Sequence, residues 1–159
     1  QVERGEITLE KARDDIMALG KLENLNIDIW EVFMAMAENG GGLRNELADY
    51  IPKIRAAGFS TGIITNNVVE FREHWRSMLA VDELFDFVID SSEVGMRKPN
   101  PAIFEKALTV GGLRAEEVIF LDDYEGNIIT ASALNIRSIL VDGDGAKTVA
   151  DLDAILCLQ

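Results

Sequence analysis

Two adjacent carboxylates stand directly after a short apolar run in the stretch VIFLDDYEGN, which contains Asp122, Asp123 and Asn127. Neighbouring anions repel each other, so either a cation or the N-terminus of a helix must stabilise the pair. A hard cation such as Mg²⁺ takes carboxylate and amide oxygens as ligands, which makes this stretch a candidate metal site. Capping of the following helix is the competing explanation, since helix N-termini favour acidic residues.

Two further polar groups stand where apolar runs end. Thr65 and Asn66 follow one such run in GIITNN, and Lys98 lies in SSEVGMRKPNP, just before Pro99 and near Pro101. Each proline disfavours helix at the residue before it, which keeps the lysine on a stiff extended loop. A hydroxyl, an amide, a cation and two carboxylates are what a magnesium-held phosphate needs. The carboxylates bind the metal, and the remaining groups bind phosphoryl oxygens.

The elements that must position these residues are short apolar segments alternating with helical ones. The pattern predicts strands at 59–65, 85–90, 118–122 and 137–142, and helices at about 68–80, 101–110, 124–134 and 147–156. Such alternation indicates an α/β fold in which helices cover both faces of a parallel sheet. Ligands bind beyond the carboxyl ends of the strands in these sheets, so Thr65, Lys98 and Asp122 are expected to face one crevice.

The N-terminal part of the chain has a different pattern. Helical spacing of apolar residues predicts helices over 7–19, 27–39 and 44–57, the last ended by Gly58 as a C-terminal cap. Three consecutive glycines, Gly40 to Gly42, indicate a flexible joint. We therefore expect a helical subdomain over residues 1–43 and an α/β core over residues 44–159.

Composition limits the class of protein. A chain of 159 residues with 48% apolar side chains suits one folded domain. Its 15 basic and 28 acidic residues give a net charge of −13, which argues against nucleic acid or an anionic membrane as the main partner. One cysteine, Cys157, excludes an internal disulfide, and no apolar run approaches a membrane span. These features, with a charged N-terminus that is not signal-like, favour a cytoplasmic protein.

Three stretches resemble motifs of a known superfamily. GIITNN, SSEVGMRKPNPAIFEKAL and VIFLDDYEGN are similar, in order, to the second, third and fourth motifs of haloacid dehalogenase-like hydrolases. The similarity is greatest to the branch that includes the N-terminal phosphatase domain of soluble epoxide hydrolase. It extends from RGEITLEKA to DLDAILCL, which is nearly the whole chain. The resemblance implies a Rossmann-like three-layer α/β/α fold in which residues 1–43 are part of a helical cap.

The resemblance also implies roles for individual residues. Thr65 and Asn66 would bind the phosphoryl oxygens, and Lys98 would neutralise charge on the phosphate and on the nucleophile. Asp123, together with Asp122, would hold Mg²⁺ directly or through water. Asn127 would support that metal site.

One part of the family pattern is missing. In the family the first motif, an Asp-x-Asp on the first strand, supplies the nucleophile, whereas cap-like sequence begins here at Gln1. Asp142 and Asp144, in SILVDGDGAKT, mimic this Asp-x-Asp, but they follow the fourth motif, and we interpret them as a turn into the last helix. The resemblance places the first strand in the middle of the sheet. Without it the sheet has a slot in which backbone groups are unpaired and apolar faces are exposed, which is unfavourable. A missing N-terminal segment, a second copy of the chain or a rearranged packing would have to fill that slot.

The expected activity is that of a Mg²⁺-dependent phosphatase acting on a small phosphorylated molecule through an aspartyl-phosphate. This truncated chain would lack the nucleophile and be inactive alone. A dehalogenase is disfavoured because the acidic pair and the lysine suit metal and phosphate. Two functions of different classes stay open, namely a non-catalytic interaction module and a receiver-type signalling domain in which Asp90 would accept the phosphate.

Overall fold

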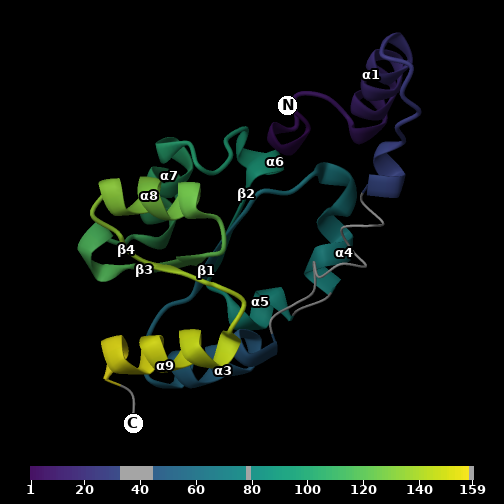
Figure 1. Cartoon of the computed structure of the whole chain (residues 1–159). Helices are drawn as coiled ribbons and strands as arrows, with labels where there is room; N and C mark the ends of the chain where they lie inside the picture. Colours follow the sequence, from purple (N-terminus) through teal and green to yellow (C-terminus); the bar gives the residue numbers. More distant parts are fainter. Residues whose placement is uncertain (33–44, 78–79, 158–159) are drawn as a thin grey trace.

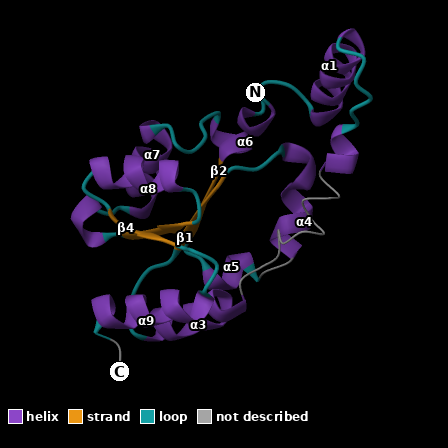
Figure 2. Ribbon diagram, in the orientation of Figure 1, coloured by secondary structure: helices purple, strands orange, loops and turns teal. Residues whose placement is uncertain are grey.

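Four short parallel strands form two separate pairs in the computed structural model, which describes residues 1–32, 45–77 and 80–157. β1 (Gly62–Thr65) pairs with β2 (Phe87–Asp90), and β3 (Ile119–Asp122) pairs with β4 (Arg137–Leu140) (Figure 2). Within the described ranges, no hydrogen bond joins one pair to the other. The predicted strands are therefore present, as two half-sheets.

Helices cover the strands on two sides. α7 (Pro101–Gly111) packs against β1 and β2, and α8 (Glu125–Ala133) packs against β3 and β4. α3 (Asn45–Ala56) and α9 (Gly145–Leu156) pack against each other on the opposite side of the strands (Figure 1). This arrangement confirms the predicted three-layer α/β/α class.

The shorter elements differ from the prediction in two places. The described part of the helix predicted over 68–80 is a 3₁₀ turn, η2 (Val69–Phe71), followed by α4 (Arg72–Ser77), and α5 (Val81–Leu84) comes after it in the chain. The expected loop after β2 starts with a one-turn helix, α6 (Ser91–Val94), which is too short to produce a periodic apolar pattern. A 3₁₀ turn, η3 (Ala115–Glu117), precedes β3.

Most of the N-terminal prediction can be compared with the structure. α1 (Leu9–Leu22) confirms the first helix, and Thr8 caps it by accepting a hydrogen bond from the Lys11 N–H at 3.1 Å. Residues 29–32 are helical, while the rest of the predicted helix over 27–39 and the glycine joint lie outside the described residues. α3 confirms the third helix, and Gly58 follows it with φ of 90°.

The first residues of the chain contact the α/β core. η1 (Val2–Arg4) packs against α6, and Glu3 forms an ion pair with Arg97 at 2.8 Å. α1 itself projects away from the strands (Figure 1). The division at residue 43 stays a prediction. Among the described residues, no helix combines the length and apolar character needed to cross a membrane.

A cavity of about 560 Å³ lies between the two strand pairs. Its lining includes Ile63 from β1 and Leu121 from β3, with Phe104 of α7 on one side. Ile54 of α3 and Leu152 of α9 line the other side. Apolar side chains from all three layers therefore surround a space bounded by one strand of each pair.

Candidate functional site

A buried ion pair joins the ends of the two half-sheets. The Lys98 Nζ donates to Asp122 Oδ2 at 2.7 Å, and the two side chains are only 12% and 6% exposed. The same Nζ lies 5.6 Å from the centre of the Phe120 ring, a distance typical of a cation–π contact. Because both charged groups are largely shielded from water, each is stabilised mainly by the other. The pair therefore holds the loop before α7 against the end of β3.

The second oxygen of Asp122 accepts hydrogen bonds from the backbone and from Asn127. Asp122 Oδ1 accepts hydrogen bonds from the Tyr124 N–H at 2.9 Å and from Asn127 Nδ2 at 2.8 Å. Asn127 is 5% exposed and lies in the first turn of α8. One oxygen of Asp122 thus holds the turn before α8, whose N-cap residue is Tyr124 and which has no side-chain cap, while the other oxygen binds the lysine.

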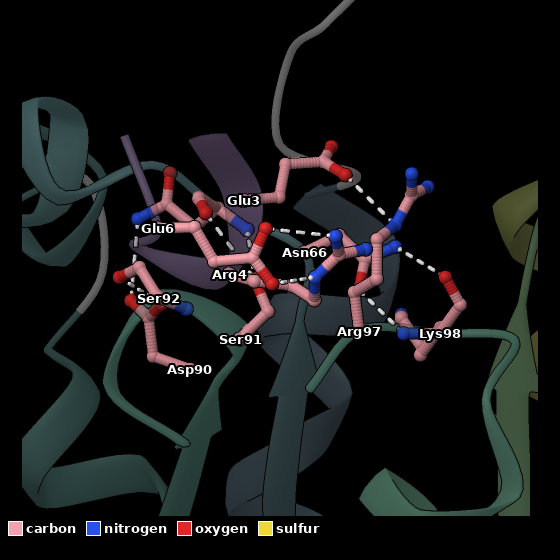
Figure 3. Close-up of polar contacts among 10 residues, drawn as sticks. Glu3, Arg4, Glu6, Asn66, Asp90, Ser91, Ser92, Arg97 and Lys98 are labelled. Carbon is pink, nitrogen blue, oxygen red and sulfur yellow. Dashed lines mark hydrogen bonds and ion pairs between the residues drawn. The ribbon is translucent and has the colours of Figure 1, made fainter. Parts of the chain in front are cut away.

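Asn66 connects the end of β1 with the lysine loop. Its Oδ1 accepts from the Lys98 N–H at 2.8 Å, and its Nδ2 donates to the Lys98 carbonyl at 3.0 Å (Figure 3). Thr65 is the last residue of β1 and pairs in register with Asp90. The structure therefore places Thr65, Asn66 and Lys98 at one set of strand ends, as the sequence predicted.

Four residues that were not among the predicted phosphatase site residues fix this region. The Ser91 hydroxyl accepts from the Asn67 N–H at 3.0 Å and donates to the Asn67 carbonyl at 3.2 Å. Asp90 has no exposed surface, and its oxygens accept from Ser92 and from Asn67 Nδ2. The available sequence signal was the run Asp-Ser-Ser after an apolar strand, which is typical of a helix cap.

The environment of Asp90 also bears on the receiver-type hypothesis. That hypothesis needs a carboxylate that a phosphate donor can reach, whereas Asp90 is fully buried and hydrogen bonded as the cap of α6. The buried position makes Asp90 a structural residue.

The residues around Asp122 fit a magnesium ion that keeps part of its water shell. Asn127 Oδ1 is buried and has no hydrogen-bond partner among the described residues, so an acceptor stands available beside Asp122. Asp123 is exposed next to it. The described ranges hold no cluster of three or more His, Cys, Asp or Glu side chains suited to a metal. Mg²⁺ commonly binds through one or two carboxylates, water and substrate phosphate, which matches this donor set.

Asp142 and Asp144 lie on an exposed turn beyond β4. Asp144 caps α9 by accepting from the Lys147 N–H at 2.9 Å, and Asp142 Oδ1 accepts from the Asp144 N–H at 3.3 Å. The interpretation of this Asp-x-Asp as a turn into the last helix is confirmed.

Residues 16–141 match the family described as haloacid dehalogenase-like hydrolase. The chain belongs to this family. Among curated relatives, it is 31% identical to bifunctional epoxide hydrolase 2 of Rattus norvegicus, over 100% of the chain and 30% of the rat protein. It is 29% identical to a phosphoglycolate phosphatase of Colwellia psychrerythraea, over 74% of the chain and 54% of that enzyme. The chain therefore spans between about a third and about half the length of these relatives.

Solved structures of haloacid dehalogenase-like enzymes share the fold. A predicted family hydrolase from Porphyromonas gingivalis aligns with a TM-score of 0.77 and 24% identity, over 99% of this chain and 78% of that one. A family enzyme from Bacteroides thetaiotaomicron, in complex with magnesium and inorganic phosphate, aligns with a TM-score of 0.69 and 22% identity, over 91% and 74% of the two chains. The fold and the hydrolase family are thus established together, and phosphatases are among the relatives.

Proposed function

We propose that this chain forms the phosphate- and metal-binding half of a Mg²⁺-dependent phosphatase acting on a small phosphorylated substrate. The Lys98–Asp122 pair is the main support, because it brings a cation and a carboxylate to the ends of strands from both half-sheets. The phosphatases among the relatives and the magnesium and phosphate bound by a family enzyme of the same fold support the same chemistry.

Each residue of the proposed site has its own role. The Thr65 hydroxyl and the Lys98 ammonium bind phosphoryl oxygens, and the lysine offsets their charge. Asp122 and Asp123 would hold Mg²⁺, and the side-chain oxygen of Asn127 would support that site. When bound, the metal stabilises negative charge on the phosphoryl group.

The nucleophile in this proposal is an aspartate outside the set of site residues around Lys98 and Asp122. It stands at the carboxyl end of an extended segment lying between β1 and β3, where the cavity is apolar and bounded by both strands. Attack by its carboxylate forms an aspartyl-phosphate and expels the substrate alkoxide, which takes a proton from the second carboxyl group of the Asp-x-Asp, and water then cleaves the acyl phosphate. Asp142 and Asp144 are excluded from this role because they lie on the exposed turn before α9.

A segment that completes the sheet is therefore the proposed macromolecular partner. It comes either from an N-terminal portion of the protein or from a second copy of this chain. Residues 1–159 alone are proposed to be inactive until that segment is bound.

The cavity between β1 and β3 also favours a second candidate function, that of a non-catalytic module that binds an extended segment. Backbone pairing with two strand edges and burial of apolar side chains in the cavity would suffice for such binding. The two candidates differ in whether the bound segment must contain an aspartate for activity.

A peptide-complementation experiment separates them. The chain is mixed with Mg²⁺, p-nitrophenyl phosphate and a synthetic peptide of five apolar residues followed by Asp-x-Asp, with an Asn-x-Asn peptide as the matched control. We expect phosphate release with the Asp peptide only, and a raised melting temperature with both. At a peptide concentration of about 100 Kd, binding stabilises the folded state by about 2.7 kcal/mol.

Different outcomes contradict specific parts of the proposal. Stabilisation by both peptides without phosphate release supports the binding module. Magnesium-dependent release by the chain alone that disappears in Asp142→Ala would place the nucleophile at Asp142 and overturn its assignment to the added segment.

A further inference from the structure

Asn66 makes a two-point contact with the backbone of a single residue. Its carbonyl oxygen accepts from the Lys98 N–H at 2.8 Å, and its amide nitrogen donates to the Lys98 carbonyl at 3.0 Å. Of the side chains similar in size to asparagine, only its amide presents a donor and an acceptor side by side in this way. Both polar atoms of the side chain are therefore directed at the lysine loop.

The residues on either side of Asn66 are themselves fixed. Thr65 is paired in register with Asp90 as the last position of β1. The Asn67 backbone is held by Ser91, whose hydroxyl both accepts from its N–H and donates to its carbonyl. Asn66 thus lies between a residue paired with β2 and a residue whose backbone is bound by Ser91.

Lys98 links this contact to the proposed phosphate site. Lys98 itself lies in a turn in which the Asn100 N–H donates to the Arg97 carbonyl at 2.9 Å, and Asn100 then caps α7. Within that turn, the Lys98 backbone is held by Asn66, while its side chain reaches Asp122.

We infer that Asn66 is a positioning residue, which acts through Lys98 and not by placing its side chain on the phosphate. The inference rests on the proposed function for its consequence, since the lysine is the proposed phosphate ligand. It replaces a direct role of the Asn66 side chain with an indirect one, because the amide oxygen and one N–H of the amide already bind the Lys98 backbone.

The first test does not require phosphate binding. In protein labelled with ¹³C-lysine, the Lys98 ε-CH₂ resonance, assigned with Lys98→Arg, reports the position of the side chain beside the Phe120 ring. Asn66→Ala removes both contacts, and Asn66→Asp keeps the acceptor but sets an oxygen against the Lys98 carbonyl. Asn67→Ala is the matched control, since the Asn67 side chain binds Asp90 and not the lysine loop.

We expect the Lys98 resonance to move toward those of exposed lysines in both Asn66 variants and to stay in place in Asn67→Ala. An unchanged resonance in folded Asn66→Ala would overturn the inference. The same would follow if Asn67→Ala produced an equal shift, because general loosening of the strand ends would then explain it.

The second test measures binding of inorganic phosphate in the presence of Mg²⁺ by calorimetry. Loss of two hydrogen bonds that fix Lys98 should weaken binding about tenfold in Asn66→Ala. In a Lys98→Met background the same substitution should change the affinity by less than about twofold, because the ammonium group that Asn66 positions is gone. Equal weakening in both backgrounds means direct contact and overturns the inference. A wild-type chain that binds no phosphate counts against the proposed function, and the resonance of Lys98 still decides the role of Asn66.

Discussion

Replacing Lys98 by methionine removes the ammonium group from the buried pair with Asp122 while keeping a side chain of similar length. The Asp122 carboxylate is 6% exposed, so it is left as a buried charge with the Tyr124 N–H and Asn127 as donors. Removing one partner of a buried pair costs about 3–5 kcal/mol. Because two donors remain, we expect the lower end of this range, a loss of about 3 kcal/mol in the free energy of unfolding.

Urea unfolding followed by circular dichroism and tryptophan fluorescence measures this loss. With a slope of about 2 kcal/mol per molar urea, the midpoint should fall by about 1.5 M. Lys147→Met is the matched control, since Lys147 is 56% exposed and pairs with Asp142 and Asp151 at the surface. Such surface pairs contribute about 0–1 kcal/mol.

Two results would refute the assignment of a buried, mutually dependent pair. One is a loss in Lys98→Met no larger than that in Lys147→Met. The other is strict additivity in the double variant with Asp122→Asn. With Asp122→Asn, replacing Lys98 leaves no unpaired buried charge at position 122. The double variant should therefore lose less free energy of unfolding than the sum of the two single losses.

Three further predictions concern other parts of the molecule. Burial and the hydrogen bond to Asp153 raise the pKa of Tyr50 to about 12, from 10.0. The stabilisation that this pKa shift represents is complete below about pH 10 and is lost as the pH rises through about 12. Urea unfolding at several pH values should therefore show a loss of stability above about pH 10 in the wild type that is absent in Tyr50→Phe. Gly62→Ala puts a Cβ 2.3 Å from the Phe87 ring, and the same assay should show a loss of about 1–3 kcal/mol. Asp142→Ala should change the free energy of unfolding by no more than about 0.5 kcal/mol, because the side chain is 54% exposed on the turn before α9. It should also leave the phosphate affinity measured by calorimetry unchanged.

The sequence predicted the order of the elements better than their ends. The apolar residue Phe59 led to a strand beginning at position 59, but its N–H donates to the Ile54 carbonyl and so continues the turn that ends α3. β1 begins only at Gly62. An apolar side chain next to a strand does not distinguish the strand from the turn that precedes it.

For the site, the sequence predicted which residues meet and not what each side chain does. Thr65, Lys98 and Asp122 could be placed together because the carboxyl ends of neighbouring parallel strands share one edge. The contact of Asn66 with the Lys98 backbone depends on the path of a loop 32 residues away. No local pattern encodes such a contact, since it requires both chain segments to have their final conformations.

The adjacency of the two carboxylates also has a physical account. Asp122 is the last residue of β3, and residues that follow one another along extended chain point in opposite directions. Asp122 accordingly points inward to Lys98, whereas Asp123 is exposed to solvent, which screens its charge. An ammonium group has three donors, and Asp122 accepts one of them. The ion pair therefore fixes the lysine between the half-sheets while two of its donors can still bind phosphoryl oxygens.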